Sequence, residues 1–100
     1  MSSFDWMFVF VTSGCSAETH TAAMQTPAGT MRAIGVSSHE EACAVAARAA
    51  EAGEVDFIEL CGDFGPEGCE QVLEAVGHRV PVGYVTYFPD EMEKLLRVVG

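Results

Sequence analysis

Six consecutive apolar residues near the start of the chain, Trp6 to Val11, restrict the fold more than any other segment. The run holds aromatic and β-branched side chains, which favour strands, and Thr12-Ser13-Gly14 ends it. A strand with one face in water alternates apolar and polar residues, whereas this run is apolar at every position. We therefore expect a first strand that is buried on both faces, as in a parallel sheet.

Strand-like runs alternate with segments of helical spacing at a step of about 25 residues. Ser38 and Glu41 have the spacing of a capping box, and Gly53 supplies a helix terminator after an alanine-rich stretch. Gly65-Pro66 opens a second helix, and Asp90 with Glu93 opens a third, amphipathic one. The expected helices are 38–53, 65–77 and 90–100, with a short helix within 16–25, and the expected strands are 6–11, 30–36, 56–60 and 81–87.

This alternation predicts an α/β fold in which four strands form a mainly parallel sheet with right-handed crossovers. Two architectures fit, a small open doubly wound sheet or half of a (β/α)₈ barrel. One hundred residues suffice for a single domain, 1–100. So small a sheet leaves edges and one incompletely covered face, so we expect a homo-oligomer.

The charge balance limits the partners of this chain. Five Lys and Arg residues stand against fifteen Asp and Glu residues, a net charge of −10. Such a chain repels phosphate backbones and anionic lipid headgroups, so we expect neither nucleic-acid nor membrane partners. The N-terminal segment lacks the basic residues of a signal peptide, and no apolar stretch approaches the length of a membrane span. We expect a cytoplasmic protein with reduced thiols.

The segment from Cys61 to Pro66 is the most informative for function. In parallel α/β sheets, ligands bind beyond the carboxyl ends of the strands, where this segment lies. Gly62 and Gly65 permit unusual backbone conformations, and the following helix presents free N–H groups. These features predict a small, partly anionic ligand there, whereas a plain tight turn is the alternative. Asp63 weakens the anion hypothesis through its charge.

Three residues are candidates for catalysis. Cys61 lies near a helix N-terminus, which activates thiols, although a free cysteine is more often a small buried hydrophobe. Glu59 occupies the middle of a strand, where it could act as a base, pair with Arg32 or meet a partner subunit. His20 follows the first strand and could reach Cys61 if the two strands are neighbours.

The predicted ligand site also takes residues from the end of the last strand. Tyr84 and Thr86 could line the same cavity, with aromatic packing as the alternative for the tyrosine. The four cysteines lack CxxC spacing, so no metal site is predicted, and the sequence leaves any cofactor unknown. The predicted ligand-binding residues are Cys61, Gly62, Asp63, Phe64, Gly65, Tyr84 and Thr86.

The segment 57–68, which contains the turn E-L-C-G-D-F-G-P, resembles part of a family of small uncharacterised prokaryotic proteins. Those proteins are similar in plan along most of the chain, including a V-P-V-G strand such as that at 80–83. The resemblance implies an α/β fold and marks the turn, but it implies no reaction.

Three functions therefore remain open. The chain could bind a small molecule at the turn, or act as a cysteine-dependent enzyme through Cys61 with His20 or Glu59. It could also be a structural subunit whose sheet mediates self-association and whose acidic surface keeps it soluble.

Overall fold

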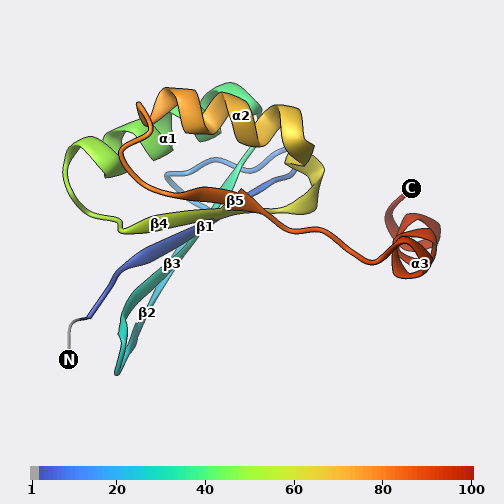
Figure 1. Ribbon diagram of the computed structural model, residues 1–100, viewed down its shortest axis with the longest axis horizontal. Coiled ribbons are helices and arrows are strands. Elements are labelled where there is room, and N and C mark those ends of the chain that lie inside the picture. The colour runs from blue at the N-terminus through green and yellow to red at the C-terminus, as the bar shows by residue number, and fades with distance from the viewer. Residues whose placement is uncertain (1–2) are drawn as a thin grey trace.

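The computed structural model describes residues 3–100, which form an α/β fold with a five-stranded sheet (Figure 1). The expected fold class is confirmed, but the sheet has one more strand than predicted and is mixed. The strands lie in the order β2-β3-β1-β4-β5. Their bounds are β1 Trp6–Val11, β2 Thr21–Thr26, β3 Gly29–Val36, β4 Phe57–Leu60 and β5 Val82–Tyr84.

The four strands that the sequence predicted form the parallel part of the sheet. Strand β1 is central and pairs in parallel with β3 on one side and with β4 on the other. Strand β5 pairs in parallel with β4 but is only three residues long, because the backbone leaves the ladder after Tyr84. Because side chains alternate along a strand, successive residues of the central strand β1 point to opposite faces of the sheet.

The short helix expected within 16–25 is wrong. Residues 16–20 form a turn, and Thr21–Thr26 is an edge strand antiparallel to β3. The Thr26 hydroxyl closes the hairpin by accepting hydrogen bonds from the N–H groups of Ala28 and Gly29, both at 3.1 Å. Alanine favours helices, but pairing with a preformed neighbouring strand outweighs this weak preference.

Two helices cover one face of the sheet (Figure 1). Helix α1 (His39–Glu51) connects β3 to β4, and α2 (Gly65–Ala75) connects β4 to β5. Both connections run in the same direction across the sheet, so right-handed crossovers place both helices on the same face. The connection from β1 to β3 runs the opposite way, but it contains a strand instead of a helix. The sheet is therefore not doubly wound.

The core lies between these helices and the sheet and consists mostly of small and medium side chains. Alanines on the inner face of α1 allow its backbone to lie close to the strands. The largest fully buried side chains of the core are Ile58, Leu60, Val9, Val36, Val72 and Val76.

The opposite face of the sheet carries five of the nine aromatic residues, and no element within residues 3–100 covers it. The prediction that the first strand is buried on both faces is therefore wrong: Met7 and Val9 are buried under the helices, but the alternate side chains of β1 are only half-buried. The register of the strands places their neighbours on the same side. We call this side the open face, which comprises Phe4, Trp6, Phe8, Phe10, Ala22, Met24, Met31, Ala33, Phe57 and Glu59.

Helix α3 (Pro89–Val99) stands apart from the rest of the domain (Figure 1). It contains no buried residue, although its helical pattern was predicted correctly. An extended segment, residues 85–88, connects it to β5. The molecule is consequently elongated, with extents of 40 × 29 × 27 Å.

We expect Gly29→Ala to destabilise the fold by about 2 kcal/mol or more. Gly29 has φ +141°, and a Cβ there would overlap the Phe4 carbonyl oxygen. Urea denaturation measures the free energy of unfolding. Gly14→Ala is the matched control, because Gly14 also has a positive φ, +88°, but faces open space. Equal losses in the two variants would contradict the steric argument.

Candidate functional site

The predicted turn lies where the sequence placed it, directly beyond the carboxyl end of β4. Cys61 continues the strand in an extended conformation, and its N–H donates to the carbonyl of Val9 at 3.0 Å. Residues Gly62–Phe64 form a short 3₁₀ helix, and Gly65 begins α2 with φ +61°. The backbone thus reverses within four residues, from the end of the sheet into the helix layer.

The turn also lies at the point where the chain connections diverge. Strands β1 and β4 are neighbours, but the connection from β1 leads toward β3, whereas that from β4 leads toward β5. Ligands of open α/β sheets typically bind at such switch points. The turn therefore occupies a position at which α/β proteins often bind ligands.

The two glycines of the turn also have structural reasons to be glycine. Gly65 occupies the left-handed region, which other L-residues rarely adopt. A Cβ on Gly62 would lie 3.2 Å from the carbonyl oxygen of Val85, because the chain after β5 passes beside the turn. The alternative of a tight turn without a ligand thus explains both residues.

Phe64 is a core residue, although one edge of its side chain borders a hollow at the surface. Its side chain is 3% exposed and stacks on the ring of His39, with the ring centroids 4.6 Å apart. This pair joins the first turns of α1 and α2. Asp63 is exposed, and no side chain caps the start of α2. A shallow hollow of about 270 Å³ lies beside the pair and is lined by His39, Phe64, Gly65, Pro66, Glu67, Gly68 and Gln71.

Glu59 and Cys61 are two residues apart in extended backbone and point to the same side of the sheet. Glu59 is exposed because no helix covers the open face. The predicted ion pair with Arg32 is wrong: Arg32 lies opposite Met7, on the helix-covered face, and Glu59 lies opposite Phe8. A general base and a contact with a partner subunit are the two explanations that remain from the sequence for a carboxylate at this position.

The structure does not bring His20 to Cys61. Strands β3 and β1 lie between the two residues, a separation of three strand spacings or about 14 Å. The His20 ring is tied into its own turn, where Nδ1 accepts the N–H of Ser16 at 3.1 Å. Within residues 3–100, no hydrogen bond links Cys61 with either proposed base. The enzyme hypothesis thus gains nothing from the geometry.

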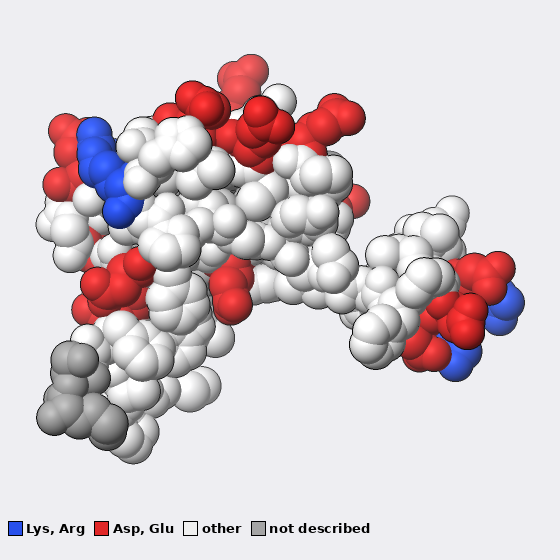
Figure 2. All heavy atoms as spheres, viewed as in Figure 1, with Lys and Arg blue, Asp and Glu red and all other residues white. Residues whose placement is uncertain are grey.

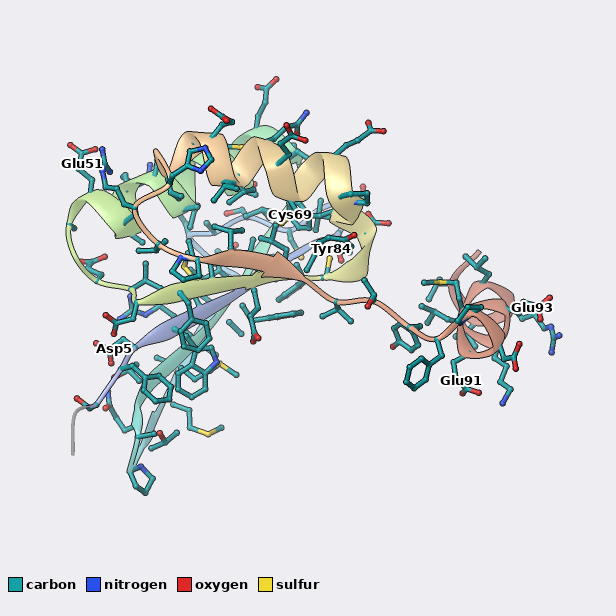
Figure 3. All side chains as sticks on the ribbon, viewed as in Figure 1. Asp5, Glu51, Cys69, Tyr84, Glu91 and Glu93 are labelled. Carbon is teal, nitrogen blue, oxygen red and sulfur yellow. The ribbon has the colours of Figure 1, made fainter. Side chains whose placement is uncertain are left out.

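The remaining predicted residues surround the turn from the side of β5. Tyr84 is half-buried and points toward the core beside α2 (Figure 3), and Thr86 is exposed.

Burial raises the pKa of the Cys69 thiol, which donates to the carbonyl of Val82 at 3.7 Å. Burial also raises the pKa of Cys43, with a smaller contribution from Glu40. Among the described residues, no cluster of His, Cys, Asp and Glu could hold a metal ion.

Sequence reasoning missed one polar contact that organises this end of the sheet. The Glu41 carboxylate accepts the N–H of Ala17 and the N–H of Ser37, each at 2.9 Å. These backbone hydrogen bonds lower the pKa of Glu41. The predicted capping box is half confirmed: the Ser38 hydroxyl accepts the Glu41 N–H at 3.0 Å, but the carboxylate holds the loop after β1 instead.

A comparison with protein families identifies the chain at family level. One family model matches residues 4–100. The chain belongs to DUF6506, a family of unknown function. This agrees with the resemblance to uncharacterised proteins, although a turn motif shared by DUF6506 members and their prokaryotic origin stay predictions. No curated protein and no solved structure matches the chain. Over residues 3–100 of this DUF6506 protein, no helix is long and apolar enough to cross a membrane.

We expect Glu41→Gln to lower the stability of this DUF6506 protein at neutral pH but not in acid. Because folding lowers the pKa of Glu41, its contribution is complete above the ordinary carboxyl pKa of about 4.3 and is lost as the pH falls through the lower, folded value. The test compares the free energies of unfolding of wild type and variant between neutral and acidic pH.

Glu40→Gln is the matched control, because Glu40 is the exposed neighbour of Glu41 on the same helix turn. A difference between Glu41→Gln and wild type that stays constant over the whole pH range would contradict the assigned role of the carboxylate.

Proposed function

We propose that this protein is a structural subunit that self-associates through the open face of its sheet. The observation that carries the proposal is the position of the aromatic residues. Of nine aromatic residues, five belong to the open face, namely Phe4, Trp6, Phe8, Phe10 and Phe57. Only Phe64 is buried in the core. The chain thus holds five of its nine aromatic side chains on the face of the sheet that α1 and α2 do not cover.

The aromatic rings pack in two groups on the same face, Phe4 with Trp6 and Phe57, and Phe8 with Phe10. Trp6 stacks on Phe57 with centroids 5.8 Å apart and an angle of 6° between the rings. Phe4 packs against both, at 5.4 and 5.7 Å. Contiguous apolar patches of several hundred Å² on a folded domain typically mark a protein interface. The patch is ordered before any partner arrives, so association loses little side-chain entropy.

The accessible surface of the chain supports the same conclusion. A folded monomer of 10.7 kDa is expected to expose about 5500 Å². This chain exposes 6496 Å², an excess of about 1000 Å². An interface of ordinary size buries about 800 Å² on each partner. The excess therefore has the size of one interface.

The distribution of charge favours the open face over other surfaces. Acidic side chains gather on the outer side of α1 and α2 (Figure 2). Among the strand residues of the open face, Glu59 is the only charged one. Two copies with a charge of −10 each repel one another least when they meet through the face with the fewest carboxylates.

We expect the wild-type protein to be an oligomer and Phe8→Glu to dissociate it. A carboxylate at the centre of the interface is desolvated without a partner, which weakens association by about 100-fold or more. Sedimentation equilibrium measures the subunit number and the dissociation constant. Gln71→Glu is the matched control, because it adds the same charge on exposed α2.

Circular dichroism shows whether both variants keep the fold, since Phe8 is only half-buried in the single chain. A monomeric wild type, or equal effects of the two substitutions, would contradict the proposal.

A small, partly anionic ligand at the turn 61–66 is a second candidate, favoured by the location of the turn at the switch point between β1 and β4. The exposed carboxylates of Asp63 and Glu67 oppose an anion there, so a ligand must also use the backbone N–H groups.

Inorganic phosphate serves as the probe for this candidate. We expect saturable shifts of the amide signals of residues 62–68 in a nuclear magnetic resonance titration. The start of α3 is an internal control, since it also has a proline in its first turn but lacks the glycine turn. Equal shifts at both helix starts, or none at 62–68, would reject the ligand candidate.

A further inference from the structure

Helix α3 is amphipathic, but no part of the domain covers its apolar side. Met92, Leu95, Leu96 and Val99 recur at the spacing of one helix face. Met92 and Leu95 are half-buried, whereas Leu96 and Val99 are 56% and 70% exposed. The charged side chains lie on the other sides of the helix, and Glu93 projects away from the domain (Figure 3). The helix therefore has the residue pattern of a helix that packs against another element, but its apolar side packs against none within the described domain.

The segment before α3 directs the helix away from its own sheet. The N–H of Val85 donates to the carbonyl of Leu60 at 2.9 Å. Beyond it, the backbone hydrogen bonds of the described residues stay within 88–100. Phe88 is extended, with φ −60° and ψ 148°, and Pro89 fixes the first helical residue. The chain thus continues outward from β5 along the long axis of the molecule (Figure 1).

We propose that α3 is an arm exchanged between two copies, in which the helix of one chain lies on the open face of the other. This inference rests on the proposed self-association and names the element that occupies the interface. Each chain has one uncovered apolar side, on α3, and one open face. In a twofold dimer the α3 helix of each chain covers the open face of the other, so all four surfaces are buried.

The dimensions of the two surfaces match. A helix of 11 residues is about 16 Å long, and a strand of six residues, such as β1, is about 20 Å long. A helix about 10 Å in diameter covers two strands, which is the width of the aromatic surface on β1 and β4. One arm therefore suffices for the aromatic part of the open face.

The stability of the helix also requires a partner. An isolated helix of 11 residues is marginal in water, because most helical stability in proteins comes from packing of the apolar side. Tyr87 and Phe88, at the end of the connecting segment, are 47% and 82% exposed and would be buried along with the helix. The second copy is the partner for which the chain itself supplies a complementary surface.

Photo-cross-linking in the full chain tests this arrangement. Benzoylphenylalanine at position 96 is placed on the apolar side of α3, and the same residue at position 93 is the control on the charged side. We expect irradiation of the Leu96 variant to give a product of twice the chain mass, with the link to residues 6–11 or 57–60. The Glu93 variant should not give this product.

The outcomes separate this inference from the proposed function. A product of single-chain mass linked to β1 or β4 would show that α3 folds onto its own sheet, and a link between two α3 helices would show helix pairing. Either result overturns the exchange. A wild-type protein that sediments as a monomer overturns the proposed function as well, whereas an oligomer with no link from position 96 to the sheet overturns only the exchange.

A pair of substitutions gives an independent measurement. Leu96→Glu should weaken association by about 10- to 100-fold, since a leucine side chain leaves the interface. Lys94→Glu changes the charge on the outer side of the same helix and should leave the subunit number unchanged. If Phe8→Glu dissociates the oligomer and Leu96→Glu does not, the open face associates without the arm and the exchange is rejected.

Discussion

The handedness of the crossover connections determines which face of the sheet the helices cover and which face they leave open. Both helical connections run across the sheet in the same direction, and a right-handed path then places α1 and α2 on the same face. The return connection from β1 to β3 could have carried a helix to the other face, but it contributes β2 to the sheet edge. Nothing in the chain's own core can replace that missing layer. The chain therefore buries one face of the sheet by folding, and the proposed self-association would bury the other.

The core that this arrangement leaves is thin. Alanines and valines dominate the contact between α1 and the sheet, and they contribute less apolar area per residue than the aromatic side chains of the open face. Hydrogen bonds and ring stacking at the end of the sheet add to the stability that this thin core provides. The Glu41 carboxylate ties the loop after β1 to α1, and the ring of Phe64 stacks on His39 to join the two helices. The edge of the sheet that resembles a binding site is thus also the edge that holds the layers together.

The sequence predicted the parallel strands and the three helices because each has a local signal. Ser38, Gly53 and Gly77 bound their helices as expected, and Trp6 to Val11 is the central strand. The burial of that strand was not predictable, because a continuous apolar run looks the same whether its own helices or another surface covers the second face. Strand β2 was missed because its alanines carry a helix preference that pairing overrides.

The position of the candidate site could be predicted from the sequence, but which residues come together there could not. The glycine turn after β4 could be placed at the carboxyl edge from strand order along the chain alone. The distance between His20 and Cys61 depends on which strands are neighbours, and no local pattern contains that information. The contact of Glu41 with Ala17 joins residues 24 positions apart, so the capping box that Glu41 forms with Ser38 could not reveal it.

If α3 is exchanged between two copies as proposed, its separation from the domain gives the chain two ordering steps of different molecularity. The sheet with α1 and α2 buries its core within one chain, so its formation is unimolecular and does not depend on dilution. Helix α3 contributes no buried residue to that core. Its order depends on whatever packs against its stripe, so a partner chain makes the step bimolecular. The helix content of this protein would then vary with concentration while its sheet content stayed constant.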